Sequence, residues 1–536
     1  MRIAVTAPQP PALVKAWRNR GYLADGRLGW LLEDAASRWP TREALVEPAG
    51  RHTFAELRRR SEAIAIALID GGVEPGDTVV WTLPNGVDAV AVAAAIWRIG
   101  AVNAPVVTIY REHEWTYVLD TLRPAAVVAP AAYRGRSHAE ELDGVLAAIG
   151  HTPRVRFVSG GTRHGWTPLD GLDAPNDGLP PEVEPSPADE PCLVLWTSGT
   201  TAAPKGVVQT PAALLHEMRM MSSQWALTWM DAMYMASPVT HITGLLQGLL
   251  VPTAVGARAV LADRWDPEAA VDAIEAEGCT FMSGATPFLQ GLVEVYEKRG
   301  LASKLREYSC GGAAVPPSLV ERAEGVGVKV HRAWGLSELP TATMAGRLDP
   351  LERRANYDGR IAPACEVEAV DEERRPLPPG NEGELRTRGP ERMAGYVDAA
   401  LNADALDAEG WLYTGDLGIV DDEGWVKVTG RVKEVINRGG EKLSARDIED
   451  VLAAHPAVAE VAVVGIPGGR LGERVCALVV PAAGSEVDPT ALTAYLEARR
   501  VAKQKIPEEF RAATELPRTA AGKVQKFRIV QDWGTA

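Results

Sequence analysis

The strongest chemical signal is a loop of hydroxyl and glycine residues that ends in a lysine: Trp196-Thr-Ser-Gly-Thr-Thr-Ala-Ala-Pro-Lys205-Gly206. Small residues let backbone amides approach an anion, hydroxyls add hydrogen-bond donors, and the lysine supplies a point charge for phosphate. The string differs from the Walker A pattern G-x-x-x-x-G-K-[ST], because GVVQT follows Lys205 and reads as a strand. An arbitrary loop of this composition is more often a surface turn. The full string instead predicts a phosphate-binding loop.

This loop resembles the phosphate-binding signature of the acyl-adenylate-forming superfamily, which includes acyl-CoA synthetases, adenylation domains of peptide synthetases and luciferases. Other segments match that family's motifs in order, from about residue 30 to the end of the chain. One departure is Ala202, where the family usually has glycine; if that position needs a positive φ, alanine costs about 1 kcal/mol. The resemblance implies nucleotide-binding roles for Thr197, Ser198, Gly199, Thr200, Thr201, Gly312, Ala313, Ala314, Trp334, Gly335, Ser337, Asp416 and Arg431.

Three of the matching segments precede residue 340. Pro238-Val-Thr-His241 looks like the motif whose histidine lines the acyl pocket, and Gly311-Gly312-Ala313-Ala314 like the loop that holds the adenine edge. Trp334-Gly-Leu-Ser-Glu338 matches Y-G-x-T-E with tryptophan for tyrosine and serine for threonine, so a flat face and a hydroxyl are both kept. The resemblance implies that Glu338 and Thr200 hold Mg²⁺, a hard cation that prefers oxygen ligands.

The remaining matches lie in the last quarter of the chain. Tyr413-Thr-Gly-Asp416 resembles the segment whose aspartate accepts the ribose hydroxyls, and Gly430-Arg-Val-Lys-Glu434 resembles the hinge motif, with Lys433 as pivot. Arg438-Gly-Gly-Glu-Lys442 looks like the loop that lines the thiol tunnel, through Gly439 and Gly440. Pro517-Arg-Thr-Ala-Ala-Gly-Lys523 matches the motif with the catalytic lysine. The implied catalytic residues are Lys523, Lys205, Glu338 and His241.

The implied reaction uses ATP and Mg²⁺ to convert a carboxylic acid into an acyl-adenylate, and then transfers the acyl group to a thiol, with coenzyme A as the expected acceptor. Within the superfamily, the chain resembles cyclohexanecarboxylate-CoA-ligase-like and medium-chain or aryl-acid CoA ligases, through the segments WDPEAAV, GATPFL, CGGAAVPPSLVERA and NRGGEKLSARDIED. The acid itself is left open, as an alicyclic, aryl or medium-chain one. We expect the acyl pocket around His241, Gly284, Ala285 and Thr286, next to the helix of Met218 and Met221.

Two other functions stay open at this point. A stand-alone adenylation enzyme would load a carrier-protein thiol, or would activate an acid or small oxyanion for attack by an amine. A catalytically silent homologue would bind nucleotide as a sensor or scaffold. The presence of Lys523, Glu338 and the hydroxyl-rich loop argues against the silent homologue.

The elements that must position these residues alternate between short apolar strands and helices. EALVE (43–47), DTVVWTL (77–83) and AVNAPVV (101–107) read as strands, and Thr53 with Glu56 forms a capping box at the start of a helix. This rhythm predicts a mixed α/β fold with parallel sheet covered by helices. We expect a large AMP-binding domain at 1–430, with subdomains at about 1–188, 189–358 and a small β unit at 359–430. A small, mobile α+β domain follows at 431–536, ending in a polar tail loop.

Composition limits the partners of this 536-residue chain. The net charge of −15 argues against a nucleic acid or an anionic membrane surface as the main partner. Five dispersed cysteines without a C-x-x-C pair fit a reducing compartment and exclude a cysteine-based zinc site. The N-terminus lacks the pattern of a signal peptide, and prolines with His241 and Gln247 interrupt the longest uncharged stretch. We therefore expect a cytoplasmic protein without a membrane span; a homodimer is one assembly left open.

Overall fold

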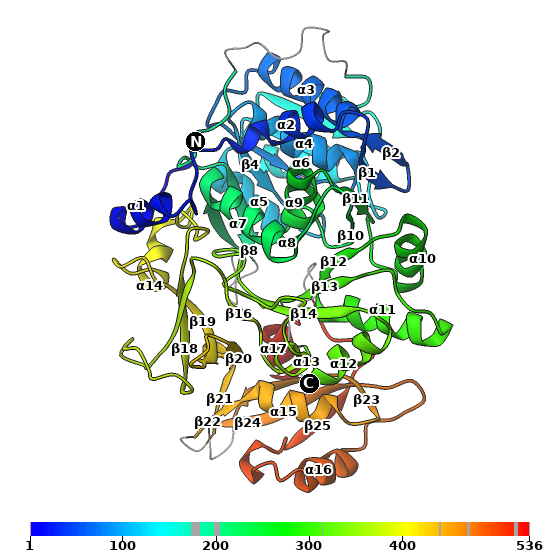
Figure 1. The fold of residues 1–536 in the computed structure, drawn as a ribbon, viewed down its shortest axis with the longest axis vertical. Helices are drawn as coiled ribbons and strands as arrows, with labels where there is room; N and C mark the ends of the chain where they lie inside the picture. The colour runs from blue at the N-terminus through cyan, green and yellow to red at the C-terminus, as the bar shows by residue number, and fades with distance from the viewer. Residues whose placement is uncertain are drawn as a thin grey trace.

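The computed structural model describes residues 2–172, 183–197, 204–312, 315–438, 441–468, 472–518 and 524–534. Figure 1 shows a large N-terminal part above a smaller C-terminal part that begins after β20. The roles expected for several residues stay predictions because those residues lie outside the described ranges: Ser198, Gly199, Thr200, Thr201, Ala202, Ala313, Ala314, Gly439, Gly440 and Lys523.

Seven strands form the first sheet in the order β7-β6-β5-β3-β4-β8-β9, and every neighbouring pair is parallel except β8 with β9. Val79 and Trp81 belong to the core on the side of α3 and α4, while Val80 between them belongs to the core of α5 and α6. The prediction of a helix-covered parallel sheet is therefore confirmed. The elements are β3 (Thr78–Trp81), β4 (Val102–Pro105), β5 (Ala126–Pro130), β6 (Val155–Ser159), β7 (Thr167–Pro168), β8 (Leu193–Thr197), β9 (Lys205–Gln209), α3 (Phe54–Asp70), α4 (Val87–Arg98), α5 (Glu112–Leu122) and α6 (His138–Ala148).

Nine strands form the second sheet in the order β16-β15-β14-β13-β12-β10-β11-β1-β2. Its central strands are parallel, and β2, β15 and β16 are antiparallel additions at the edges. Tyr234 and Met282 face the core that contains α10, α11 and α12. The elements are β1 (Glu43–Glu47), β2 (Gly50–Thr53), β10 (Ala232–Met235), β11 (Arg258–Leu261), β12 (Phe281–Gly284), β13 (Glu307–Cys310), β14 (Lys329–Trp334), β15 (Thr343–Met344), β16 (Arg360–Ile361), α10 (Pro267–Glu277), α11 (Thr286–Arg299) and α12 (Pro317–Gly325).

The two sheets do not separate along the chain at about residue 188. Strands β8 and β9 follow that position and complete the first sheet, where Leu193 pairs with Asn103 of β4. Strand β1 precedes it and belongs to the second sheet, where Leu45 pairs with Ala259 of β11. The burial of apolar strands decides which strands pair. The order of the segments along the chain therefore did not predict that β1 joins the second sheet while β8 and β9 join the first.

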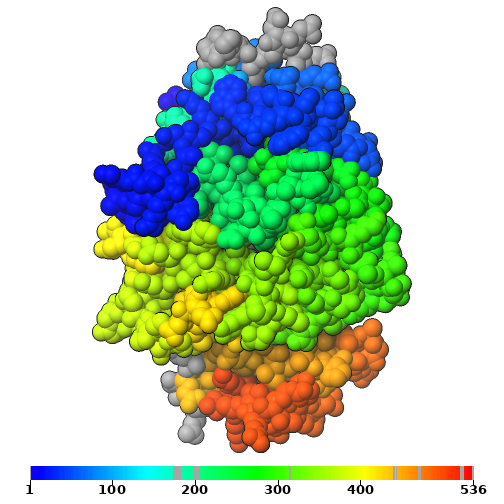
Figure 2. Space-filling model, viewed as in Figure 1, coloured from blue at the N-terminus to red at the C-terminus, as the bar shows by residue number. Residues whose placement is uncertain are grey.

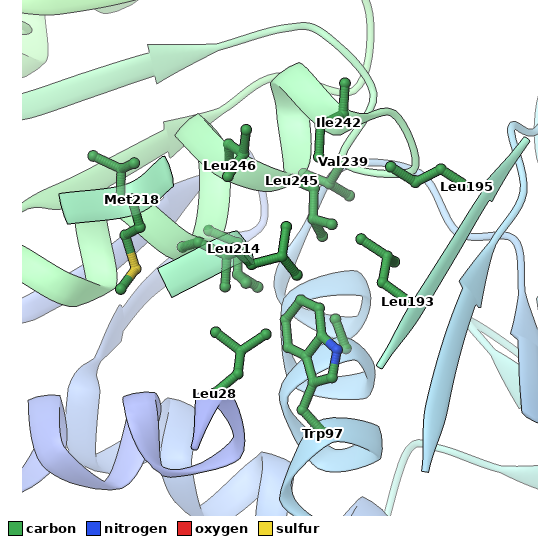
Figure 3. Close-up of a cluster of buried hydrophobic side chains, with 14 of the residues drawn as sticks. Leu28, Trp97, Leu193, Leu195, Leu214, Met218, Val239, Ile242, Leu245 and Leu246 are labelled. Carbon is green, nitrogen blue, oxygen red and sulfur yellow. The ribbon is translucent and has the colours of Figure 1, made fainter. Parts of the chain in front are cut away.

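A central apolar core lies between the two sheets (Figure 3). Figure 3 shows Leu193 and Leu195 of β8 on one side of this core and Met218 of α7 (Pro211–Gln224) on the other, with Leu214 and Leu245 between them. That leucine belongs to a continuous helical segment made of α8 (Ile242–Leu245), a π-helical turn (Leu246–Leu250) and α9 (Val251–Val255). The helix of Met218 and Met221 thus packs against the helix that follows His241, and both methionines are buried.

A small antiparallel sheet, β17-β18-β19-β20, follows the second sheet. Its order confirms the antiparallel β unit expected after Gly359. The longest strand, β19, pairs Asp416 with Arg431 of β20, which is the last strand before the C-terminal part. The strands are β17 (Glu366–Val370), β18 (Glu382–Arg388), β19 (Leu412–Val420) and β20 (Val426–Arg431).

The C-terminal part forms the lower lobe in Figure 2. Ser444 caps α15 by accepting a hydrogen bond from the amide of Asp447. The prediction of a polar tail loop was wrong, because α17 ends the described chain and buries Ile529 and Trp533, four residues apart. The elements are β21 (Val435–Arg438), β22 (Glu441–Ser444), α15 (Ala445–Ala453), β23 (Val458–Pro467), β24 (Glu473–Pro481), α16 (Pro489–Ala498), β25 (Glu509–Ala512) and α17 (Lys526–Gly534).

Shorter helices connect these units, and none of the helices in the described ranges is both long and apolar enough to cross a membrane. The connecting helices are α1 (Pro11–Asn19), α2 (Leu31–Arg38), α13 (Leu351–Asn356), α14 (Asn402–Ala405) and the 3₁₀ turns η1 (Leu28–Trp30), η3 (Ala399–Leu401), η4 (Val432–Glu434) and η5 (Lys503–Lys505).

Candidate active site

Four of the predicted site segments follow the carboxyl ends of four adjacent parallel strands. His241 lies after β10, Gly284 ends β12, Gly312 lies after β13, and Trp334 ends β14. Because neighbouring parallel strands end at the same edge of a sheet, these segments share one edge. Crevices at this edge are where open α/β sheets bind ligands.

The two ends of the phosphate-binding loop are held together by the antiparallel pair β8–β9. Thr197 pairs with Lys205, and Trp196 pairs with Gly206. Strand β9 confirms that a strand, not a helix, follows Lys205. The carbonyl of Gly206 also accepts a hydrogen bond from the amide of Val397 at 2.8 Å. The end of the loop is thus attached to a segment far along the chain, residues 393–397.

Tyr396 connects Lys205 to Glu338. The ammonium nitrogen of Lys205 lies 5.1 Å from the centre of the Tyr396 ring, a cation–π distance. The phenol oxygen of Tyr396 donates a hydrogen bond of 2.7 Å to Oε1 of Glu338. Burial, followed by the charge of Glu338, raises the pKa of Tyr396, so its proton stays in this hydrogen bond. Sequence reasoning missed Tyr396, for which no motif was recognised.

Backbone contacts fix the segment that carries Glu338. Gln209, the last residue of β9, donates from Nε2 to the carbonyl of Ser337 at 2.9 Å. The amide of Met393 donates to the carbonyl of Glu338 at 2.7 Å. Gly335 is required here, because a Cβ at that position would lie 1.9 Å from the carbonyl oxygen of Pro340. The backbone around Glu338 is therefore fixed on both sides of the residue, and Glu338 as a whole is 9% exposed.

Trp334, Asp416 and Arg431 form one connected group. The indole nitrogen of Trp334 donates to Oδ2 of Asp416 at 2.8 Å, and Nε of Arg431 lies 2.9 Å from Oδ1. Asp416 is 3% exposed, and its charge is the main cause that raises the pKa of Arg431. The structure thus brings together three of the residues for which the resemblance implied nucleotide-binding roles.

His241 precedes α8 and caps it, since its Nδ1 accepts from the amide of Thr243 at 3.5 Å. Gly244 passes so close to Pro238 that a Cβ would lie 2.1 Å from the Pro238 carbonyl oxygen. Strand β12, adjacent to β10, ends at Gly284, where a Cβ would meet the Tyr308 hydroxyl at 2.7 Å. The predicted acyl-pocket residues therefore lie on neighbouring strand ends, with Ala285 and Thr286 opening α11.

Lys433 lies in the short turn η4 between β20 and β21 and is exposed. The neighbouring Glu434 is bound by Lys526, whose ammonium lies 2.9 Å from Oε2 of Glu434 and 2.9 Å from Oε1 of Glu449 on α15. Since Lys526 begins α17, the turn that contains Lys433 is tied to the last helix of the chain.

Comparison with known proteins identifies the family. Residues 32–397 match the model of the AMP-binding enzymes, and residues 447–523 match the AMP-binding enzyme C-terminal domain. The chain is 35% identical to the medium-chain fatty-acid–CoA ligase of Escherichia coli K12, over 96% of this chain and 92% of that protein. It is 33% identical to the salicyl-AMP ligase / salicyl-S-ArCP synthetase of Mycobacterium tuberculosis, over 99% and 94%.

Among solved structures, ATP-bound MatB from Rhodopseudomonas palustris is similar over 95% of this chain and 99% of that one, with a TM-score of 0.84 and 25% identity. The chain belongs to the AMP-binding enzyme family, the acyl-adenylate-forming superfamily that the motifs predicted. Its mixed α/β fold, with a large N-terminal part and a small C-terminal part, is the fold of that family.

Proposed function

We propose that this protein joins a carboxylic acid to a thiol at the expense of ATP, through an acyl-adenylate, and that coenzyme A is the thiol. One observation carries the proposal: Lys205, Tyr396 and Glu338 form one connected group, and Trp334, Asp416 and Arg431 form another, on segments that meet at the edge of the second sheet. The first group suits phosphates with a metal ion, and the second suits an adenosine.

The first half-reaction is a displacement at the α-phosphate of ATP. A carboxylate oxygen forms the new bond to phosphorus, and the bond to pyrophosphate breaks. No enzyme nucleophile is needed, because the carboxylate is itself nucleophilic. The protein's task is to align and neutralise two anions that repel each other. Lys205 would hold the pyrophosphate, and Lys523 would bridge the carboxylate and the α-phosphate.

Magnesium fits this arrangement. Within the described ranges, no group of three or more histidine, cysteine, aspartate or glutamate side chains could hold a metal ion. Glu338 offers a single carboxylate whose Oε1 is oriented by Tyr396, and Mg²⁺ in nucleotide sites commonly takes one or two protein oxygens together with phosphate oxygens. Glu338 and Thr200 would be those protein ligands. The bound cation would screen the phosphate charge.

In the second half-reaction the thiol attacks the acyl carbon, and AMP leaves. We propose that residues 431–536 turn about Lys433 between the two steps, which removes Lys523 and brings Gly439 and Gly440 to the thiol entrance. The position of Lys433 in a short exposed turn between two sheets supports a pivot at this residue. The large domain would then be 1–430, with the small β unit at 359–430.

For the acid we propose a medium-chain, alicyclic or aryl acid. The relative from E. coli is named for medium-chain fatty acids and the one from M. tuberculosis for salicylate. The predicted pocket is compatible with an apolar acid, since His241 opens the helical segment that packs on Met218 in the apolar core. A cytoplasmic location is part of the proposal, because ATP and free thiols are supplied there.

A second candidate is transfer of the acyl group to a carrier-protein thiol. The printed name of the M. tuberculosis relative includes a carrier-protein acceptor, and that relative covers nearly the whole chain. The adenylation half-reaction would be the same, so only the acceptor separates the two candidates.

Pyrophosphate exchange with a panel of carboxylic acids tests the adenylation step. We expect label from pyrophosphate to enter ATP only with an acid that the pocket accepts. Product analysis by mass spectrometry with coenzyme A, a phosphopantetheinylated carrier protein or an amine then identifies the acceptor. Nucleotide binding without exchange for any acid would instead indicate a silent homologue.

A further inference from the structure

Five polar side chains form a buried cluster beside the proposed site, which we call the buried acid cluster: His216, Glu217, Thr341, Cys365 and Glu391. Glu217 and Glu391 have no exposed surface, and the other three are at most 9% exposed. The members come from four segments of the chain, namely α7, the segment after Glu338, the residue before β17 and the turn after β18. No sequence motif marks this cluster.

The hydrogen bonds of His216 decide which of its nitrogens carries the proton. Nδ1 lies 3.0 Å from the carbonyl oxygen of Tyr22, which can only accept, so Nδ1 donates. Burial lowers the pKa of His216 to about 4, and the ring is therefore neutral near pH 7. Nε2 is then a lone-pair acceptor, 3.6 Å from Oε2 of Glu391. A lone pair facing a carboxylate oxygen repels it unless that oxygen carries a proton.

Within the described part of the chain, the carboxyl groups of Glu217 and Glu391 each accept a hydrogen bond at only one of their two oxygens. Oε1 of Glu391 accepts from the Cys365 thiol at 2.7 Å, and Oε1 of Glu217 accepts from the Thr341 hydroxyl. Among the described residues, Oε2 of Glu217, Oε2 of Glu391 and Nε2 of His216 have no hydrogen-bond partner. In the same part of the chain, no lysine or arginine forms an ion pair with either carboxyl. Two unpaired carboxylates buried together would be costly.

Protonation of Glu217 and Glu391 removes the cost of burying two unpaired carboxylates. Burial raises the pKa of Glu391 to about 7, and burial together with the charge of Glu391 raises the pKa of Glu217 well above its usual range. Among the described residues, the other titratable or charged groups around the cluster do not supply a cation. Arg392, next to Glu391, bonds Gln9 and the carbonyl of Ala7 instead. Burial keeps the Cys365 thiol protonated, Glu366 is negative, and Arg219 on α7 is exposed and bonds the Tyr22 carbonyl.

The cluster is connected to Glu338 by two short routes. Thr341, which donates to Glu217, lies three residues after Glu338 in the same segment. Met393, two residues after Glu391, donates its amide to the carbonyl of Glu338. Tyr396, five residues after Glu391, donates to the Glu338 carboxylate. The position of the Glu338 segment therefore depends on Glu217, which binds Thr341, and on Glu391, which precedes Met393 and Tyr396 in the same stretch of chain.

We propose that Glu217 and Glu391 are positioning residues for the reaction, and that they hold Glu338 in place only while both carboxyls are protonated. The inference rests on the proposed function. Loss of the Glu391 proton to solvent would place a negative charge against the lone pair of His216 and close to Glu217. The turn after β18 would then move away, and with it Met393 and Tyr396, the two residues that bond Glu338.

The test compares pH profiles of pyrophosphate exchange between about pH 6 and about pH 9. For the wild type, we expect kcat/KM to fall by about tenfold per pH unit above about pH 7, as loss of one proton requires. Glu391→Gln has the shape of the protonated acid, and its amide can donate to Nε2 of His216. This variant should keep activity at low pH and lose the alkaline decline. Glu366→Gln, at an exposed carboxylate paired with Arg388, is the matched control and should keep the wild-type profile.

Stability gives a second readout. Because the pKa of Glu391 is raised on folding, the unfolded state releases the proton first, and its contribution to stability is lost as pH rises from about 4.5 towards about 7. Tm of the wild type should fall over this range more than Tm of Glu391→Gln. If Glu391→Gln does not fold, Glu217→Gln replaces it in this test. The raised pKa of Glu217 predicts that Tm depends on pH in the same direction.

The outcomes separate the two proposals. An unchanged alkaline decline in both glutamine variants would overturn the positioning role while exchange at low pH still supports the proposed function. A uniform loss of activity at every pH, with a lower Tm, would also overturn it, because a merely structural role predicts that result. Absence of exchange in the wild type at any pH would contradict the proposed function itself.

Discussion

The indole nitrogen of Trp334 donates a hydrogen bond to Oδ2 of Asp416, at 2.8 Å, although 82 residues separate them. The bond connects the end of β14 in the second sheet to β19 in the small antiparallel sheet. An adenine-stacking face and a ribose acceptor would thus be parts of one rigid group, and Arg431 holds the other oxygen of the same carboxylate.

Trp334→Ala should weaken ATP binding about tenfold, because stacking on a wide aromatic face contributes about 0.5–1.5 kcal/mol beyond burial. Trp334→Tyr is the matched control, since it keeps a flat face, and it should stay within about threefold of the wild type. Titration calorimetry with ATP measures both. Unchanged affinity in Trp334→Ala would place the adenine elsewhere.

Tyr396→Phe removes the hydrogen bond to Glu338 and leaves the ring near Lys205 in place. Hydrogen bonds to charged groups contribute about 1.5–3 kcal/mol, so we expect adenylation to slow by about tenfold or more. The Mg²⁺ concentration at half-maximal rate should rise as well. Tyr495→Phe, which removes a hydroxyl bonded to a carbonyl in the C-terminal part, is the control. An unchanged Mg²⁺ dependence in Tyr396→Phe would show that Tyr396 does not orient Glu338.

Glu338→Gln should largely abolish pyrophosphate exchange while the protein stays folded. The amide oxygen can still accept from Tyr396, so the variant removes the charge and keeps the contact. Loss of that charge weakens the site for the cation that screens the phosphates. Circular dichroism and the exchange rate measure the two effects. A drop in Tm with normal specific activity would instead assign Glu338 to a structural role.

Lys523→Ala should cut adenylate formation by about 10²–10³, the usual scale for removing one transition-state donor, and should leave thioester formation from pre-made adenylate nearly intact. Lys433→Pro should do the reverse, because proline fixes φ at the pivot and blocks rotation. Single-turnover assays of each half-reaction measure both. If both variants slow both halves equally, one static site explains the results better than two conformations.

Helices are predictable from the sequence where capping residues, prolines and glycines mark both of their ends. Asp266 caps α10 through the amide of Ala269, Pro267 is its first residue, and Gly278 ends it in the left-handed region. Each of these signals acts within one helical turn, so the local sequence contains both of the observed bounds of this helix, Pro267 and Glu277. The capping box of Thr53 and Glu56 is confirmed for the same reason.

Contacts between distant residues were beyond such signals. Glu217 stands on a helix, and a glutamate there would normally face solvent; its partners Thr341 and Glu391 follow more than a hundred residues later. No local sequence pattern indicates the role of Tyr396 either, because that role depends on the contacts of residues 393–397 with β9 and with Glu338. The motifs predicted which segments meet, and the tertiary structure adds the residues that hold them there.

The fate of the carboxylate oxygens tests acid activation most directly. The acid is supplied with heavy oxygen in its carboxylate, and the protein converts it with ATP and coenzyme A. Attack of a carboxylate oxygen on the α-phosphate, followed by attack of the thiol on the acyl carbon, leaves one labelled oxygen in AMP. Mass spectrometry should find AMP with a single heavy oxygen and pyrophosphate with none. Label in inorganic phosphate, with ADP as the nucleotide product, would contradict formation of an acyl-adenylate.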